Sequence, residues 1–314
     1  MNENTINPPR APLSRIELNG DTRIVEFRGA DVDAFLQGQL TADVRKLLPG
    51  AALRAGFCSP KGRLLATLAL SRTSDGAIYA ALPDAIAARI VARLKMFVLR
   101  SKVSIALLDT TVIGLLGNLI GPRLAELGFA SGAADAGTDP SATVHALPCG
   151  VRRCLLFGPS ERIATLLAQD PGIVDGALGD WHREEIRAGW PRIVEANQDH
   201  YVPQMVNLDQ LGALSFDKGC YTGQEIVARL HYLGDVKRRM FVCEGEGPPP
   251  APGSPVHAEQ GGQAVGSIVQ AVPAAAGSPL YLAAVVLQLS QASGTALYCE
   301  GRPLGPPRAY EYDG

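Results

Sequence analysis

Apolar residues recur along this chain with two spacings, and each spacing predicts one kind of secondary structure. A spacing of three to four residues predicts amphipathic helices at residues 83–97 and 160–167. Short runs of β-branched and aromatic residues predict strands before and between these helices. The alternation of strands and helices favours two related α+β units. The predicted strands of these units lie at residues 22–27, 64–70, 111–116 and 153–157.

The last quarter of the chain contains only the strand pattern. A stretch rich in Pro and Gly at residues 244–255 predicts a linker or a long turn. The β-rich runs at 263–272, 280–289 and 296–300 that follow predict a small all-β domain, a partly open barrel. We therefore expect a first α+β unit at 1–110, a second at 111–205, a segment at 206–240 that packs back on both, and a β-barrel domain at 241–314.

Composition limits the class of protein. Of the 314 residues, 46% are hydrophobic and 19% are charged, which is typical of a globular chain. The formal net charge of −2 argues against direct binding of nucleic acid through bulk charge. No apolar run approaches the roughly 18 residues of a membrane span, and the first twenty residues contain no apolar targeting core. We expect a cytoplasmic protein with reduced thiols and no direct membrane contact.

Six cysteines are present, but none forms a C-x-x-C pair or a zinc or ferredoxin spacing, which argues against a self-contained metal site. One of them, Cys220, lies in the stretch KGCYTGQE at residues 218–225. The T-x-x-E spacing of a capping box predicts a helix that begins at Gly223. Cys220 would then lie beside the helix N-terminus, with Lys218 two residues away, and both effects favour the thiolate. A buried structural cysteine in a tight turn explains the spacing equally well.

Two further places offer candidate binding residues. Lys61 and Arg63 lie at the tip of a predicted hairpin, where solvated turn charges are the usual interpretation and anion binding is the alternative. Another predicted helix, 181–188, begins after a capping Asp180. Its Trp181 can stack on a flat ligand or fill core. The polar residues that follow it in the helix indicate either a solvated face or a site.

These residues resemble a known family. The stretch at 218–225 is similar to the signature of the YgfZ family of folate-binding proteins, relatives of the glycine-cleavage T-protein. The similarity continues in order across most of the chain. It includes GAD at 29–31, LQGQLTADV at 36–44, AGWP at 188–191 and VPQMVNL at 202–208.

The resemblance implies a fold and a cofactor. The fold would be α+β, a T-protein-like ring of two α+β units and a small C-terminal β-barrel around a central folate-sized channel. Residues 1–110 would be the folate-binding unit, and the cofactor would be tetrahydrofolate or a derivative. Cys220 and Lys218 would provide the chemistry. Trp181 would border the folate, with Lys61 or Arg63 near its anionic tail, and the remaining cofactor contacts would come from Tyr221, Gly223 and Gln224.

One residue departs from the pattern of the resembled proteins. The T-protein uses a Glu directly before Ala-Gly to bond the pterin, and this chain has Arg187 at that place. Arginine cannot accept a hydrogen bond. Glu184 and Glu185 are the nearby carboxylates that can substitute.

Three functions compete. The resemblance implies a tetrahydrofolate-binding factor for assembly or repair of iron–sulfur enzymes, including tRNA-modifying ones, with assembly proteins or client enzymes as partners. One thiolate cannot hold a cluster, so further ligands would come from a partner, glutathione or Cys58. The second function is a folate-dependent aminomethyl or methyl transferase, which needs a carboxylate that the strand at 64–70 does not contain. The third is a cysteine nucleophile enzyme with His200 or His231 as base.

Overall fold

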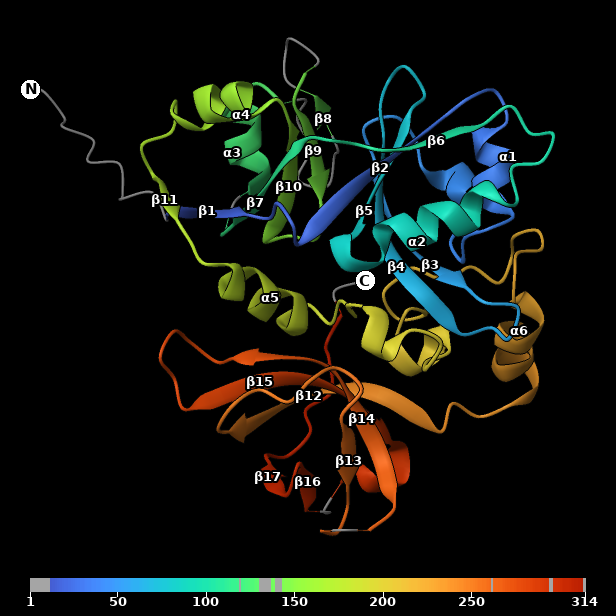
Figure 1. The fold of residues 1–314 in the computed structure, drawn as a ribbon, viewed down its shortest axis with the longest axis vertical. Coiled ribbons are helices and arrows are strands. Elements are labelled where there is room, and N and C mark those ends of the chain that lie inside the picture. The colour runs from blue at the N-terminus through green and yellow to red at the C-terminus, as the bar shows by residue number, and fades with distance from the viewer. Residues whose placement is uncertain are drawn as a thin grey trace, which may run out of the picture.

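The structure is a computed structural model that describes residues 12–118, 120–129, 137–138, 143–260, 262–293 and 296–312. Two β-sheets with helices on their outer faces lie side by side, and a β-barrel lies against one end of the pair (Figure 1). The mixed α+β class and the barrel expected from the sequence are both confirmed. Within the described ranges, no helix combines the length and the apolar character needed to cross a membrane.

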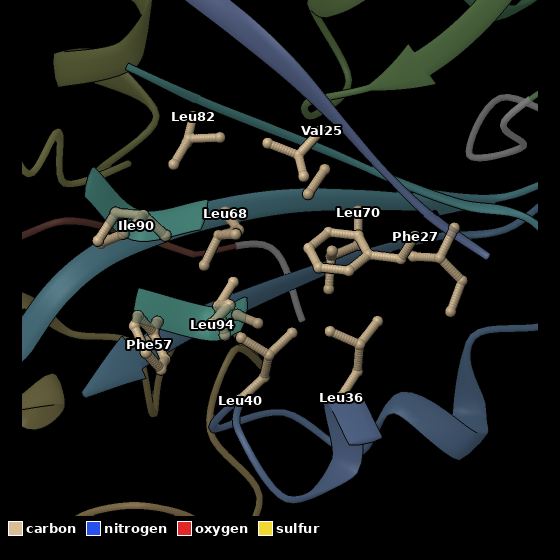
Figure 2. Packing of buried hydrophobic residues seen from close by; sticks show 14 of the residues in the cluster. Val25, Phe27, Leu36, Leu40, Phe57, Leu68, Leu70, Leu82, Ile90 and Leu94 are labelled. Carbon is tan, nitrogen blue, oxygen red and sulfur yellow. The ribbon is translucent and has the colours of Figure 1, made fainter. Parts of the chain in front are cut away.

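The first sheet has the strand order β3-β4-β5-β2-β6. Helices α1 (Val32–Gln37) and α2 (Asp84–Lys95) cover one face, and the 3-10 helix η1 (Val44–Lys46) follows α1. Apolar side chains from the strands and both helices fill the space between them, as Figure 2 shows. The strands are β2 (Thr22–Arg28), β3 (Ala52–Cys58), β4 (Leu64–Arg72), β5 (Ile78–Pro83) and β6 (Ser104–Leu107).

The second sheet has the order β11-β1-β7-β10-β9-β8, with α3 (Ile120–Glu126) and α4 (Ser160–Leu167) packed on it. Its strand β1 (Leu13–Glu17) comes from the start of the chain and pairs with β7 and β11. The segment expected as the first unit, 1–110, therefore contributes one strand to the second sheet. The other strands are β7 (Thr111–Leu116), β8 (Gly137–Thr138), β9 (His145–Pro148), β10 (Arg153–Gly158) and β11 (Ile173–Asp175).

The inner faces of the two sheets pack against each other. Tyr79 of β5 and Phe157 of β10 meet edge to face, with ring centroids 5.1 Å apart. Trp181 of the following segment is part of this shared core and closes one side of it.

The barrel is closed, in the order β12-β15-β14-β13-β16-β17, and not partly open as expected. The segment 244–255 is not simply a linker, because its first residues complete β12 (Arg238–Glu246) and pair with β15. The outer face of the barrel packs on the segment between α5 and α6, which joins it to the two sheets. The remaining strands are β13 (Pro255–His257), β14 (Ala264–Pro273), β15 (Leu280–Gln288), β16 (Leu297–Cys299) and β17 (Arg302–Leu304).

Two helices connect these parts. Helix α5 (Leu178–Arg187) lies between the sheets and the barrel, and α6 (Gln224–Leu233) lies on the opposite side in the view of Figure 1. Asp180 does not cap α5 as predicted; it lies in the first turn, where its carboxylate accepts the N–H of Ala177 at 2.9 Å. Three short 3-10 helices complete the fold: η2 (Glu195–Asn197), η3 (Pro203–Val206) and η4 (Leu289–Gln291).

Candidate functional site

A small cavity lies where the two sheets meet α5, and the space in it that is wide enough for a water-sized group is only about 30 Å³. We call it the Trp181 cavity. Both tryptophans of the chain, Trp181 and Trp190, line it. The charged residues of the wall are Glu185, Arg54, Arg153 and Arg192. The wall therefore combines flat aromatic surface with three cations and one carboxylate.

Helix α5 presents Trp181 and Glu185 to this cavity because residues four apart share one face of a helix. Trp181 is only 2% exposed and its ring lies on Gly114 of β7. A Cβ at position 114 would be 2.6 Å from the ring, so glycine is required for this close approach. The guanidinium of Arg153 stands 5.1 Å from the centroid of the Trp181 ring, within the range of a cation–π contact.

Glu185 is buried between two arginines. Its carboxylate lies 3.5 Å from a guanidinium nitrogen of Arg153 and 3.5 Å from one of Arg192. Arg192 also pairs with Asp21 at 2.8 Å, and His182 contacts the same Asp21 oxygen at 3.0 Å. Burial acts to raise the pKa of Asp21, but the hydrogen bond from His182 and the charge of Arg192 outweigh it, and the pKa falls below its ordinary value. The cavity wall is thus held by a network of opposite charges.

The barrel contributes one more polar group beside Glu185. The side-chain N–H of Gln270 on β14 donates to the Glu185 carboxylate at 3.4 Å. The other amide atom, Oε1 of Gln270, is buried and has no hydrogen-bond partner within the described residues. A buried acceptor without a donor is costly, so this oxygen indicates a place for an additional donor.

The two carboxylates considered as substitutes for the missing Glu differ in position. Glu185 lines the Trp181 cavity, whereas Glu184 pairs with Arg152 at 3.7 Å and Arg187 at 3.6 Å outside the lining. The Arg187 side chain is 56% exposed. The polar residues of α5 predicted either a solvated face or a site. A solvated face is wrong for Arg183, Glu184 and Glu185, because these three residues are buried.

Cys220 lies on an exposed turn before α6. It is the one exposed thiol among the six cysteines, all of which fall in the described part of the chain. The turn packs on the β3–β4 hairpin, where a Cβ at Gly223 would collide with the carbonyl oxygen of Ser59 and the Cα of Gly62. Gly223 also has φ of +83°, a left-handed conformation that favours glycine. The thiol is therefore exposed on a backbone held firmly in place.

The capping box predicted for α6 does not form. Gly223 occupies the N-cap position, and no side chain caps the helix there. Instead, the Gln224 side-chain oxygen accepts the N–H of Tyr221 at 3.3 Å. The left-handed Gly223 shifts the helix start by one residue relative to the pattern, which takes Thr222 out of the cap position.

Lys218 anchors the turn to the loop after α1. Its ammonium donates to the carbonyl oxygens of Leu40 at 2.6 Å and Ala42 at 2.7 Å, and lies 5.2 Å from the centroid of the Tyr221 ring. Burial lowers the pKa of Lys218 to about 8. Both of these hydrogen bonds go to backbone carbonyls and not to the thiol of Cys220.

The hairpin cations lie near the turn and away from the Trp181 cavity. Lys61 is exposed at the tip. Arg63 donates to the carbonyl of His200 at 2.6 Å and lines a different hollow beside β14. Neighbouring Cys58 is fully buried, and burial raises the pKa of its thiol to about 12, which disfavours it as a metal ligand.

The structure thus separates the predicted residues into two groups. Trp181 and Glu185 meet in the cavity, while Lys61, Tyr221, Gly223 and Gln224 lie around the Cys220 turn. Sequence reasoning missed Arg54, Arg153 and Arg192 as cavity residues. They come from three segments far apart in the chain, and no motif spacing connects them.

The two helix-covered sheets and the closed barrel define a fold class, that of the aminomethyltransferase T of the glycine cleavage system. The crystal structure of aminomethyltransferase T from Bartonella henselae matches this chain with a TM-score of 0.75. The match covers 96% of this chain and 86% of the Bartonella chain. The two sequences are 14% identical, so the likeness concerns the fold. No protein-family model matches the chain.

Curated relatives add a likeness in sequence. The tRNA-modifying protein YgfZ of Escherichia coli O157:H7 (strain EC4115 / EHEC) is 34% identical over 250 residues, which cover 75% of this chain and 73% of the relative. That of Serratia proteamaculans (strain 568) is 33% identical over 260 residues, 76% and 75% of the two chains. That of Vibrio vulnificus (strain YJ016) is 32% identical over 253 residues, 79% and 76%. The chain belongs to the YgfZ family.

Proposed function

We propose that this protein binds tetrahydrofolate or a derivative in the Trp181 cavity and supports assembly or repair of iron–sulfur enzymes through the Cys220 thiol. Enzymes that modify tRNA are among the clients we propose, in keeping with the name of the relatives. The observation that supports this most is the exposure of Cys220 on a fixed turn while the other five thiols are buried. A thiol that acts on a partner must be reachable, and this one is.

The chemistry of the residues that line the cavity suits a reduced folate. A pterin ring is flat and carries N–H donors beside ring acceptors, so it needs an aromatic surface, a carboxylate and a donor. Trp181, Glu185 and Arg153 provide these three. Gln270 is not in the lining but lies beside Glu185, and its unpaired Oε1 can accept a further N–H. When bound, the folate supplies one-carbon chemistry. Glu185 would hold the ring N–H groups.

The exposed sulfur of Cys220 suits a role as an iron ligand or sulfur nucleophile, because cysteine sulfur is soft and binds iron and iron–sulfur clusters. One thiolate cannot hold a cluster, so the partner protein must provide the other ligands. A Cβ at the neighbouring Gly219 would have no atom within 4 Å, which leaves open space beside the thiol for such a partner.

Folate binding is tested by titrating the protein with 5-formyltetrahydrofolate and following tryptophan fluorescence, since both tryptophans line the cavity. We expect saturable quenching in the wild type. Glu185→Gln should weaken binding at least tenfold, about 1.4 kcal/mol, by removing the acceptor charge. Glu184→Gln is the matched control one residue away and should bind as the wild type does. Absence of saturable binding would refute the folate part of the proposal.

The thiol is tested separately in a strain that lacks the endogenous YgfZ-family protein. Cys220→Ala should abolish support of an iron–sulfur reporter enzyme while its unfolding curve matches that of the wild type. A thiol reagent should label one sulfur rapidly in the native wild type and none rapidly in the variant. A Cys220→Ala protein that restores the reporter fully would remove the thiol from the mechanism. A purified protein that transfers an aminomethyl group from donor to acceptor would favour the transferase instead.

A further inference from the structure

Arg54 is the cation of the Trp181 cavity that lacks a carboxylate partner. It projects from β3, and its Nη2 donates to the carbonyl oxygen of Cys149 at 2.9 Å. Its guanidinium lies 5.5 Å from the centroid of the Trp190 ring. Within the described part of the chain, no Asp or Glu oxygen lies within 4.0 Å of it, in contrast to Arg153 and Arg192. Its hydrogen-bond partner is neutral.

A second cation stands beside Arg54. Nη2 of Arg153 donates to the same Cys149 carbonyl oxygen at 3.2 Å, so two guanidinium groups converge on one neutral acceptor. Burial first, and the charge of Arg153 second, lower the pKa of Arg54. Arginine nevertheless stays protonated at neutral pH. The wall therefore keeps two like charges close together, an arrangement that costs free energy unless an anion joins them.

The charges around the cavity also show that one negative charge is missing. Three arginines, Arg54, Arg153 and Arg192, face the cavity, and two carboxylates, Glu185 and Asp21, contact them, which leaves a net charge of +1. The hydroxyl of Tyr312 also lies near Arg54, but its pKa is raised to about 12 by burial, so it is neutral at physiological pH. It cannot supply the missing negative charge.

We propose that Arg54 is a ligand-binding residue that recognises an acidic group on the occupant of the Trp181 cavity. The occupant is then a flat aromatic acid, and an uncharged ring alone binds poorly. This inference rests on the proposed function, in which the occupant is a folate. The acid can be the glutamate carboxylate of a folate or a carboxylate attached directly to the pterin ring, and both would pair with a guanidinium.

The experiment compares the affinities of four probes by tryptophan fluorescence or calorimetry. They are 6-methyltetrahydropterin without an acid, pterin-6-carboxylate, tetrahydrofolate and p-aminobenzoylglutamate without a pterin. Arg54→Gln should weaken binding of at least one acid-bearing probe tenfold or more and leave 6-methyltetrahydropterin unchanged. The affected probe identifies where the acid lies. Arg54→Lys should recover part of the loss, and the salt dependence of binding should decrease in Arg54→Gln.

The controls separate this inference from the proposed function. Arg152→Gln removes a cation that is 49% exposed and pairs with Glu184, so it should change no affinity. Because Arg54 has no carboxylate partner, its replacement leaves no buried carboxylate unpaired, and the variant should fold; an unfolding curve checks this. Equal losses for acidic and neutral probes, or no loss, would overturn the role of Arg54. If no pterin binds but p-aminobenzoylglutamate does so through Arg54, the folate proposal fails and this one stands. If no probe binds, both fail.

Discussion

The Trp181 cavity and the Cys220 turn both bury charge, but they compensate it in different ways. In the cavity, the Glu185 carboxylate lies between the guanidinium groups of Arg153 and Arg192. At the turn, the half-buried ammonium of Lys218 is hydrogen-bonded to two neutral carbonyls, and in the described residues no carboxylate lies within 4.0 Å of it. The cavity is held by paired charges, and the turn is held by hydrogen bonds to backbone carbonyls.

This difference explains how each region keeps its shape. The cavity side chains orient one another, so their positions are set before a ligand arrives, as binding with little reorganisation requires. The turn owes its shape to the packing of Gly223 on Gly62 and to the Lys218 anchor. Cys220 contributes to neither, which leaves its thiol free for a partner. Substitutions should therefore act through charge balance in the cavity and through backbone geometry at the turn.

The largest effect is expected from Glu185→Ala. It leaves Arg153, whose side chain is 2% exposed, as an uncompensated buried cation, and should lower the free energy of unfolding by about 3–5 kcal/mol. Glu184→Ala is the control on the same helix, because its partners Arg152 and Arg187 are half-exposed; it should cost less than about 1 kcal/mol. Urea unfolding measures both. Equal losses would show that the cavity is not held by its paired charges.

The turn is tested by Gly223→Ala. The new Cβ combines a left-handed φ with a collision against the hairpin backbone, and we expect a loss of about 2–4 kcal/mol. Gly212→Ala provides the control, since Gly212 has φ of +67° and no atom within 4 Å of a Cβ. It isolates the conformational cost, about 1–2 kcal/mol. If both variants lose the same stability, the hairpin contact does not shape the turn.

Local sequence pattern was sufficient for most elements. The helix at 83–97 and the strands at 64–70 and 153–157 appear as α2, β4 and β10, because periodicity reports which face of an element is buried. The same information could not place β1 in the second sheet. Its partners β7 and β11 are about 100 and 160 residues away, and only tertiary packing decides that pairing.

The candidate site was predictable only in part, for the same reason. Trp181 was singled out for its aromatic ring, and Glu185 as one of two carboxylates near Arg187. Glu185 lines the cavity because its partners Arg153, Arg192 and Gln270 come from three other segments. A polar helix pattern alone suggests solvent, since it does not show that distant residues satisfy the buried charges.

The smallest effect concerns the pH dependence that Lys218 contributes. Its pKa is about 8 in the folded protein, against an ordinary value of 10.5, because burial disfavours the charged form and the nearby Arg45 adds to this while Asp43 opposes it. Between these two values the unfolded chain binds more protons than the folded one, so the stability of the wild type should rise with pH. Below pH 8 both states hold the proton, and the contribution is constant.

Lys218→Met removes this titration and keeps an unbranched chain of similar length. The difference in unfolding free energy between the wild type and Lys218→Met should therefore shift in favour of the wild type from about pH 7 to about pH 9.5. Measuring a difference cancels the groups that both proteins share. A difference that stays flat over this range would mean that Lys218 titrates normally. The Lys218 ammonium at the turn would then be as well compensated as the Glu185 carboxylate in the cavity. The contrast between the two regions would be lost.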